Sequence, residues 1–279
     1  MKFQKPITEV IKMRTSCRTY DLHDIENEVV QKLYNYTEKI NSEANGKARF
    51  KIINKNNKKD STVKLGTYGV ISGADSFIVG IINKDNKDEL IFGYLFEKII
   101  LFATDLGLQT CWLGGTFNRE DFVALTDLKE NEFIPIVSPV GYRKGKKRIL
   151  ESAMRLAAGS DNRKPWSELF FNGDISKSLS ESDAGSYAVP LEMVRLGPSA
   201  SNKQPWRIVK DNNMYHFYLC RTKGYGLASY DMQKNDIGIA MCHFELTSKQ
   251  SGLCGNWQEL KNTISPDGWE YVITWATEI

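Results

Sequence analysis

Three short stretches of the sequence combine residue types that could hold a flat, charged ligand. The first is Arg14-Thr15-Ser16-Cys17-Arg18, in which two arginines flank a serine hydroxyl. Arginine suits a phosphate group because its rigid fork gives charge-assisted, bidentate hydrogen bonds. This stretch therefore predicts an anion site, and its structural alternative is a solvated basic turn after a helix.

The other two stretches are rich in small residues. Leu113-Gly114-Gly115 would let the backbone approach a ring closely, although paired glycines also suit a tight turn that needs positive φ. Pro198-Ser199-Ala200-Ser201-Asn202 opens a loop that continues through Gln204-Pro205-Trp206. Small hydroxyls and amides between prolines favour a site for a planar polar ligand, and the alternative is a rigid helix-to-strand connector.

Regular elements are predicted on either side of these stretches. Apolar residues at helical spacing predict helices, β-branched and aromatic runs predict strands, and glycine after the last apolar turn predicts a helix end. In the first part of the sequence, the expected elements are a short helix over 7–11 after Pro6, a helix from about Asp24 that ends within 41–46, and strands over 50–53 and 77–82. They continue with a buried helix over 90–106 capped by Gly107, a short strand over 108–115, a helix beginning near Asn118 and a strand over 133–140. In the last part we expect helices over 149–158 and 191–196 and a strand over 207–209.

One of these strands contains two prolines, Pro135 and Pro139. Proline lacks the N–H group that a central strand donates to its neighbour. We therefore expect the strand over 133–140 to be broken and to lie near the edge of its sheet.

The sequence also contains a weak internal repeat. A shift of 145 positions, the distance from Gly93 to Gly238, aligns two stretches without a gap. It places Gly93, Leu101, Gly107, Leu108 and Trp112 on Gly238, Leu246, Gly252, Leu253 and Trp257, and Arg18 on Arg163. Both copies fall on a long helix that ends at a glycine, the second over about 236–251. Because repeats set the architecture, we interpret the chain as two related halves that meet at a basic cluster over 144–148.

Bulk composition excludes several classes of protein. The chain has 279 residues, 41% of them hydrophobic, which is enough for one large domain or two packed halves. Its formal net charge of +3 is spread along the chain and predicts no nucleic-acid partner. No uncharged apolar run suits a membrane span or a signal peptide, so we expect a cytoplasmic protein without a membrane partner. Five cysteines without a CxxC pair and three scattered histidines predict neither a disulfide framework nor a metal site.

The three stretches together carry a family resemblance. Arg14-x-Ser16-x-Arg18, Gly107-Leu108-x-Thr110-Cys111-Trp112-Leu113-Gly114-Gly115 and Pro198-Ser199-Ala200-x-Asn202-x-Gln204-Pro205-Trp206 make the chain resemble the FMN-dependent nitroreductase family over nearly its full length. It looks like the single-chain branch in which two nitroreductase-like halves are fused. The motif order departs from an ordinary subunit, where the PSAxNxQPW-type loop lies between the other two motifs.

The resemblance implies an α+β fold of two fused halves, 1–148 and 149–279. Each half would have a mixed, mostly antiparallel sheet flanked by helices, and the two would pack as an intramolecular pseudo-dimer. In the ordinary family the flavin lies at the dimer interface, between the RxSxR-type and GG-type segments of one subunit and the PSAxN-type loop of the other. The fused chain would therefore build one complete site inside a monomer.

The cofactor implied by the resemblance is FMN. Arg14 and Arg18 would bind its phosphate, the paired glycines would approach the flavin N5, and the serine-rich loop would cover the ring. Arg163 matches a family segment that reaches the phosphate, or it is only the counterpart of Arg18. The expected cofactor-binding residues are Arg14, Thr15, Ser16, Arg18, Leu113, Gly114, Gly115, Arg163, Pro198, Ser199, Ala200, Ser201 and Asn202.

The implied activity is a two-step oxidoreductase reaction. Hydride would pass from NADH or NADPH to the flavin N5 and then to a planar electrophilic acceptor such as a nitroaromatic or a quinone. No side chain is expected to act as a catalytic acid, base or nucleophile. The alternatives are a non-catalytic flavin-binding or flavin-storage protein and, less favoured, an acyl-transfer enzyme that uses Cys17 or Cys111.

Overall fold

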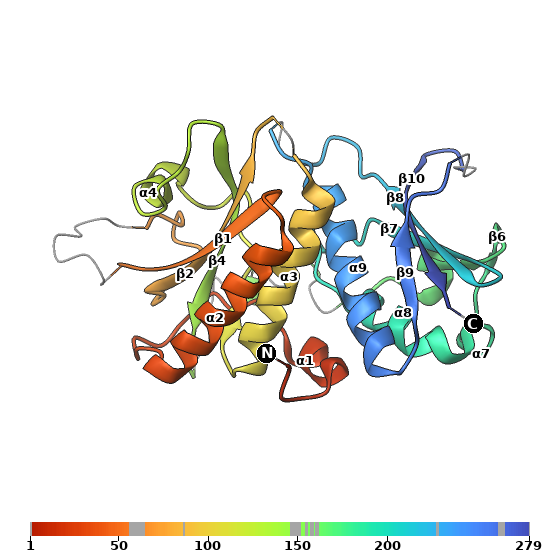
Figure 1. Ribbon diagram of the computed structural model, residues 1–279, viewed down its shortest axis with the longest axis horizontal. Helices are drawn as coiled ribbons and strands as arrows, with labels where there is room; N and C mark the ends of the chain where they lie inside the picture. Colours follow the sequence, from red (N-terminus) through yellow and green to blue (C-terminus); the bar gives the residue numbers. More distant parts are fainter. Residues whose placement is uncertain are drawn as a thin grey trace.

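The computed structural model contains two α+β units that lie side by side, with one long helix of each next to the other in the centre (Figure 1). It describes residues 2–55, 65–85, 87–145, 152–153, 156, 159, 162–226, 229–261 and 266–278. Among the described residues, no helix is both long and apolar enough to cross a membrane.

The first unit is built on a four-stranded antiparallel sheet in the order β1-β2-β4-β3. Its strands are β1 (Ala48–Asn54), β2 (Ser76–Asn83), β3 (Gln109–Thr110) and β4 (Glu132–Gly141), and its helices are α1 (Ile7–Met13), α2 (Asn27–Glu43), α3 (Glu89–Asp105) and α4 (Arg119–Val123). Ile78 and Ile82 of β2 pack toward α2 and α3, whereas Val79 and Ile81 point to the opposite face, toward α4. Because both faces are covered, β2 is an almost unbroken apolar run rather than an alternating one.

The second unit has a six-stranded sheet in the order β6-β5-β7-β8-β10-β9, in which only the β5–β7 pairing is parallel. Its strands are β5 (Phe170–Asn172), β6 (Asp174–Ser178), β7 (Trp206–Asp211), β8 (Met214–Cys220), β9 (Gly255–Gln258) and β10 (Trp269–Thr277). Its helices are α6 (Trp166–Leu169), α7 (Glu181–Ala184), η2 (Gly185–Tyr187), α8 (Ala188–Arg195), η3 (Ala200–Asn202) and α9 (Met232–Gln250). Large buried side chains join α9 to this sheet, among them Trp206, Phe217, Phe244 and Trp275.

The two units share one topology. The segment β1-β2-α3-β3-β4 of the first and the segment β7-β8-α9-β9-β10 of the second have the same strand order and the same antiparallel pairings. The pairing of the second strand with the fourth shifts register in both, between Gly80 and Ile82 in β2 and between Tyr271 and Ile273 in β10. This agrees with two related halves, although the expected boundary between 148 and 149 lies outside the described residues.

The helices α3 and α9 cross at two glycines that the internal repeat pairs with each other. A Cβ on Gly93 would overlap the carbonyl oxygen of Asn235 and lie 3.0 Å from its carbonyl carbon. A Cβ on Gly238 would overlap the carbonyl oxygen of Leu90 and lie 2.7 Å from the Tyr94 nitrogen. Leu90 and Asn235 are also related by 145 positions. Gly93 therefore contacts Asn235 in the same way that its counterpart Gly238 contacts Leu90, the counterpart of Asn235. Such reciprocal contacts are what an approximate two-fold axis produces.

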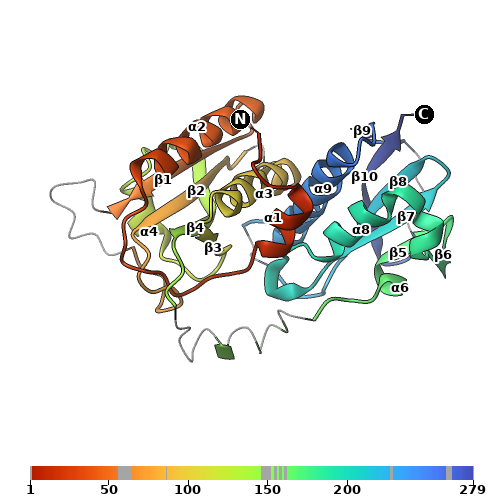
Figure 2. The same ribbon diagram turned by 90° about the horizontal axis from the view of Figure 1, so that it is seen from below.

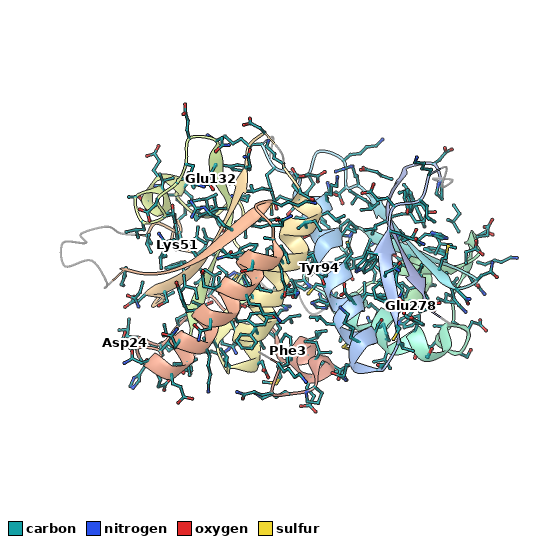
Figure 3. The ribbon with its side chains drawn as sticks, viewed as in Figure 1. Phe3, Asp24, Lys51, Tyr94, Glu132 and Glu278 are labelled. Carbon is teal, nitrogen blue, oxygen red and sulfur yellow. The ribbon has the colours of Figure 1, made fainter. Side chains whose placement is uncertain are left out.

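The crossing continues into buried polar contacts. His243 of α9 and Glu97 of α3 are fully buried, and their Nε2 and Oε1 atoms are 2.9 Å apart. Trp112 Nε1 donates to the other oxygen of Glu97 at 2.9 Å. Tyr94, which lies between the two helices in Figure 3, donates to Glu245 at 2.9 Å. Two side-chain pairs, Glu97 with His243 and Tyr94 with Glu245, are therefore hydrogen-bonded across the interface.

Helix α1 seals the lower end of this interface (Figures 1 and 2). Its buried residues Ile7, Val10 and Ile11 pack together with Leu101 of α3, Met193 of α8 and Cys242 of α9. Each such aliphatic side chain contributes roughly 1.5–3 kcal/mol when it is fully buried. Helix α1 therefore fixes the position of the arginine-rich segment that begins at the next residue.

Most predicted elements are confirmed, including both central helices and the short helix before Arg14. The helix predicted over 236–251 begins earlier, at Met232, because the Asp231 side chain caps it by accepting the N–H groups of Gln233 and Lys234. The helix predicted over 149–158 falls mostly outside the described residues.

Two strand predictions need correction. The strand predicted over 133–140 is continuous rather than broken, although it lies near the edge of its sheet as expected, between β2 and the two-residue edge strand β3. Pro135 is tolerated because it falls in the bulge where two residues of β4 oppose one of β2. The strand predicted over 108–115 is only Gln109–Thr110, followed by a single bridge from Leu113 to Val137.

Replacing Gly238 by alanine should destabilise the protein. The added methyl group would overlap backbone atoms of α3, which cannot move aside as a side chain can. We expect G238A to lower the free energy of unfolding by about 1–3 kcal/mol or more, as overpacking of a core does, measured by urea denaturation. The matched control is G145A, where a Cβ would meet no heavy atom within 4 Å. Equal stability of the two variants would contradict the close crossing.

Candidate functional site

The arginine-rich segment lies in extended conformation at the end of α1. Arg14 has φ −63° and ψ 116°, and only 8% of its surface is exposed. Ser16 forms a parallel bridge with Thr110, and the Cys17 N–H donates to the Thr110 carbonyl at 2.9 Å. Alternate residues of an extended chain share a side. The spacing therefore presents Arg14, Ser16 and Arg18 together.

Thr15 points away from that side. Its hydroxyl accepts a hydrogen bond from Arg143 Nη2 at 2.8 Å, and the same guanidinium nitrogen donates to Gln109 Oε1 at 2.9 Å. Arg143 lies just beyond the end of β4, after Tyr142, so it ties the arginine-rich segment to the sheet of the first unit. The sequence analysis did not identify this residue.

The paired glycines follow the arginine-rich segment's partner strand. Leu113 is buried and exchanges backbone hydrogen bonds with Val137 at 2.9 and 3.0 Å. A Cβ on Gly114 would lie 2.5 Å from Met232 Cε and 2.9 Å from its Sδ, at the first turn of α9. Neither glycine is among the described residues with positive φ. Gly114 thus lies against the Met232 side chain of the other unit, and a positive φ does not explain this glycine.

An arginine that the sequence analysis missed holds this turn. Arg119, the first residue of α4, donates from Nη2 to the Gly114 carbonyl at 2.9 Å and from Nε to the Ile134 carbonyl at 3.0 Å. Burial lowers its pKa, and the nearby Tyr68 opposes that shift. Gly115 itself is exposed.

The serine-rich loop runs from the end of α8 to β7 and has an unusual backbone. Ser201, Asn202 and Gln204 have φ of 47°, 55° and 49°, a left-handed region that non-glycine residues rarely enter. The Ser199 hydroxyl accepts from the Gln204 N–H at 2.8 Å, and Tyr225 donates to the Ser201 hydroxyl at 2.8 Å. Backbone strain of this kind persists only where surrounding contacts hold it, and it concentrates at functional sites.

Side-chain bonds from the segment before α6 hold the loop in this shape. Arg163 donates from Nη1 to Asn202 Oδ1 at 2.6 Å and from Nη2 to the Leu196 carbonyl at 3.2 Å. The Asn202 amide donates to the carbonyls of Gly159 and Asn162, both at 2.7 Å. The structure therefore brings Arg163 and Asn202 together. Arg163 binds the loop, and Asn202, a residue of the loop, binds the segment before α6.

Segments of both units meet on one face of α9. Met232 receives Gly114, and the Asp236 carboxyl accepts the Ala200 N–H at 3.1 and 3.2 Å. One further stretch along the helix, His243 Nδ1 is 2.8 Å from the Met193 carbonyl, just before the loop. Residues four and seven apart share a helix face. The glycine turn and the serine-rich loop therefore lie beside each other along the first turns of α9.

The donor types of the three stretches suit a flavin nucleotide. Its phosphate dianion needs cationic donors, which Arg14 and Arg18 supply, and its flat ring needs backbone donors and small side chains on either side. The exposed Gly115 and the partly exposed residues Pro198, Ser199 and Ala200 meet that need. In the described parts of the chain, no group of three or more His, Cys, Asp or Glu side chains could hold a metal ion.

A depression in the surface lies elsewhere on the second unit. It measures about 770 Å³ and is lined by residues near the β7–β8 turn and the end of α9, among them Asn212, Tyr215, Leu253 and Cys254. No predicted cofactor-binding residue lines it. The chemistry of the donors, and not the size of a hollow, identifies the candidate site.

Comparisons with known proteins bear on this site. A family model described as "Putative TM nitroreductase" matches residues 6–248. Among solved structures, the chain is similar to a putative nitroreductase from Thermotoga maritima MSB8, with 19% identity and a TM-score of 0.59 over 99% of this chain and 95% of that chain. That likeness spans both units and confirms the predicted nitroreductase-like α+β fold.

Two further structures match a smaller part of the chain. A nitroreductase family protein from Clostridium difficile 630 has 22% identity and a TM-score of 0.43 over 60% of this chain and 96% of that one. An FMN-dependent nitroreductase from Clostridium difficile R20291 has 18% identity and a TM-score of 0.40 over 50% and 88%. The comparison with curated proteins gives no significant match.

The buried carboxyl of Asp236 should give the protein a distinctive pH dependence. Burial raises its pKa well above 3.8, the Ala200 N–H lowers it and Asp231 raises it. A pKa that is higher in the folded state means that the stability contribution is complete below about pH 4 and is lost as the pH rises through the folded value. D236N keeps an oxygen acceptor for Ala200 and cannot ionise. We expect the wild type to lose stability relative to D236N between pH 4 and pH 8 in urea denaturation.

The matched control is D24N, because Asp24 is an exposed carboxyl of the first unit, on the outer side in Figure 3. Its stability difference from the wild type should stay small across the same pH range. A D236N difference that is just as flat would show that the Asp236 carboxyl is not penalised by burial.

Proposed function

The chain belongs to the family described as putative TM nitroreductases, and from this premise we propose that it is an FMN-dependent oxidoreductase with one cofactor site at the junction of its units. The observation that supports this proposal most directly is that Gly114, from the first unit, and Ala200, from the second, contact residues on neighbouring turns of α9. Neither unit supplies all three stretches, so the site is complete only where the two meet.

Each stretch has a distinct role in this proposal. Arg14 and Arg18 neutralise the phosphate, and Thr15 and Ser16 supply hydroxyl or backbone donors around it. Leu113, Gly114 and Gly115 bring backbone to the edge of the ring. Arg163 holds the loop through Asn202 and the Leu196 carbonyl, and its charge would favour the phosphate from the second unit. The ring is covered by Pro198, Ser199, Ala200, Ser201 and Asn202.

The residues of the chain contribute orientation and electrostatics. When bound, FMN would supply a centre, N5, that accepts a hydride and gives it up again. The serine-rich loop covers one side and excludes water there, so that a reduced nicotinamide, NADH or NADPH, and then a planar acceptor can use the other side in turn. Nitroaromatics and quinones are acceptors of suitable shape. Cys17 and Cys111 are buried at 0% and 1% exposure, which does not suit the acyl-transfer alternative.

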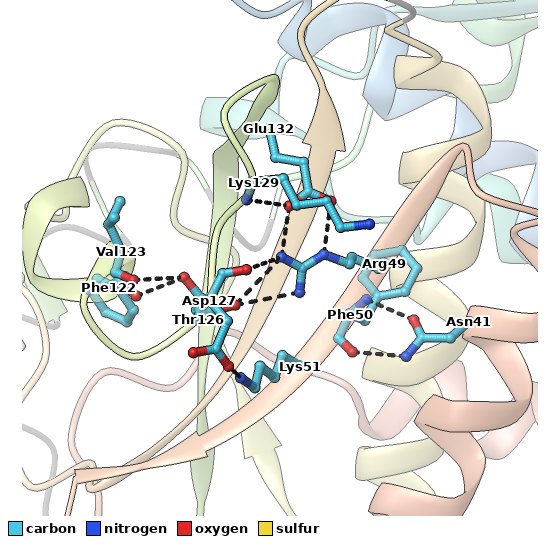
Figure 4. A network of polar contacts seen from close by, with 10 residues as sticks. All are labelled: Asn41, Arg49, Phe50, Lys51, Phe122, Val123, Thr126, Asp127, Lys129 and Glu132. Carbon is cyan, nitrogen blue, oxygen red and sulfur yellow. Dashed lines mark hydrogen bonds and ion pairs between the residues drawn. The ribbon is translucent and has the colours of Figure 1, made fainter.

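Replacing Arg14 by alanine should weaken FMN binding. Hydrogen bonds to a charged group contribute about 2 kcal/mol, so the dissociation constant should rise roughly 30-fold. The measurement is quenching of flavin fluorescence during titration of protein stripped of FMN. The matched control is R49A, because Arg49 lies in the same unit but bonds to Glu132 and to the loop after α4 (Figure 4).

The outcome separates the competing functions. Wild-type protein that takes up no FMN would overturn the proposal, and unchanged affinity of R14A would remove Arg14 from the site. Bound FMN that anaerobic NADH and NADPH both fail to bleach would instead favour a flavin-binding or flavin-storage protein.

A further inference from the structure

Arg119 is placed to aim a single backbone N–H group. Its guanidinium is anchored twice, at the Gly114 carbonyl of the turn and at the Ile134 carbonyl of β4, at 2.9 and 3.0 Å. Its Cζ also lies 4.9 Å from the centre of the Phe117 ring. Because β4 is part of the sheet, the fork is fixed in space and holds the Gly114 carbonyl toward itself.

The Gly114 carbonyl and the Gly115 N–H belong to one peptide unit. This unit is planar and trans, and the structure contains no cis peptide bond among its described residues. The C=O and N–H bonds of a trans peptide point in opposite directions. A carbonyl held toward Arg119 therefore turns the Gly115 N–H away from Arg119.

The Gly115 N–H is available to donate to a bound ligand. Gly115 is exposed, and its N–H donates to none of the residues that the structure describes. The peptide is held in this orientation by the hydrogen bond from Arg119 to the Gly114 carbonyl, beside Met232 of α9. The structure thus holds a backbone donor in a set orientation at the junction of the two units.

We propose that Arg119 is a positioning residue that orients the Gly115 N–H as a hydrogen-bond donor to the N5 edge of the bound flavin. This inference rests on the proposed FMN function. Arg119 does not touch the cofactor itself. Its charge also polarises the peptide through the Gly114 carbonyl, which strengthens the donor at the other end of the same unit.

Lysine could not take over this role. The guanidinium reaches two carbonyls with two different nitrogens of a rigid plane, whereas an ammonium is a single point charge on a flexible stem. R119K therefore separates the effect of charge from the effect of geometry, and R119M removes both.

The test uses the full-length protein reconstituted with ¹⁵N-labelled FMN. The ¹⁵N resonance of N5 reports whether a hydrogen bond is donated to that atom, so it should move in both R119M and R119K toward the value of flavin without such a bond. Anaerobic bleaching by NADH at saturation should slow on the order of tenfold while KM changes little, because orientation and not binding is lost. R49M is the matched control: Arg49 also donates to backbone carbonyls, those of Thr126 and Asp127, and it should leave the N5 resonance unchanged (Figure 4).

The possible failures are distinguishable. Wild-type protein that binds no FMN overturns the proposed function, and this inference with it. Wild-type protein that binds FMN while R119M and R119K keep the wild-type N5 resonance overturns only the role of Arg119. If R119K behaves as the wild type while R119M is altered, the charge of Arg119 explains the effect, and the proposed role of the guanidinium geometry is overturned. If R119M does not fold, R119K decides the question by itself.

Discussion

The contact between the backbones of α3 and α9 is the constraint on which the rest of the structure depends. Two helices can approach this closely only where neither carries a Cβ, and Gly93 and Gly238 provide that at the crossing. The approach brings the first turns of α9 to the first unit, so Met232 reaches Gly114 while Asp236 holds Ala200. A wider crossing would separate these two contacts and leave the candidate site divided between the units.

Buried polar groups give the crossing a fixed register. The Met193 carbonyl can only accept, so His243 Nδ1 carries a proton, and Glu97 accepts a hydrogen bond from Trp112. His243 Nε2 lies 2.9 Å from Glu97 Oε1, so both ring nitrogens have partners in the interior. Sliding one helix along the other would strand these groups without partners in the interior, which costs far more than the bonds contribute. Because Met193 lies in α8, which leads into the serine-rich loop, the same network also holds the helix on which that loop begins.

Patterns in sequence could predict what depends on neighbours along the chain. The central helices, the short helix before Arg14 and the α+β class follow from periodicity and motifs, and the structure confirms them. Arg119, Arg143 and Asp236 escaped prediction because their partners are backbone groups or side chains on other elements. Such hydrogen bonds produce no recognisable residue spacing in the sequence. The position of Asp236 offered no clear hint, since it follows the polar run Gln233-Lys234-Asn235 and reads as one more polar residue at the start of the helix. The bulge that admits Pro135 depends on pairing with β2 and could not be seen locally.

The two halves also show different constraints on scaffold and site. The crossing needs a glycine from both helices, because either Cβ alone would overlap the opposite backbone whatever the protein binds. The proposed FMN site has no such symmetry: paired glycines stand at 114–115 where the second half has Glu259-Leu260, and the serine-rich loop of the second half aligns with a lysine-rich stretch over 53–61. A homodimer must encode every motif in one subunit, whereas a fused chain needs each motif only once. We infer that the packing of α3 on α9 constrains both of its glycines, whereas the proposed site constrains only one copy of each motif.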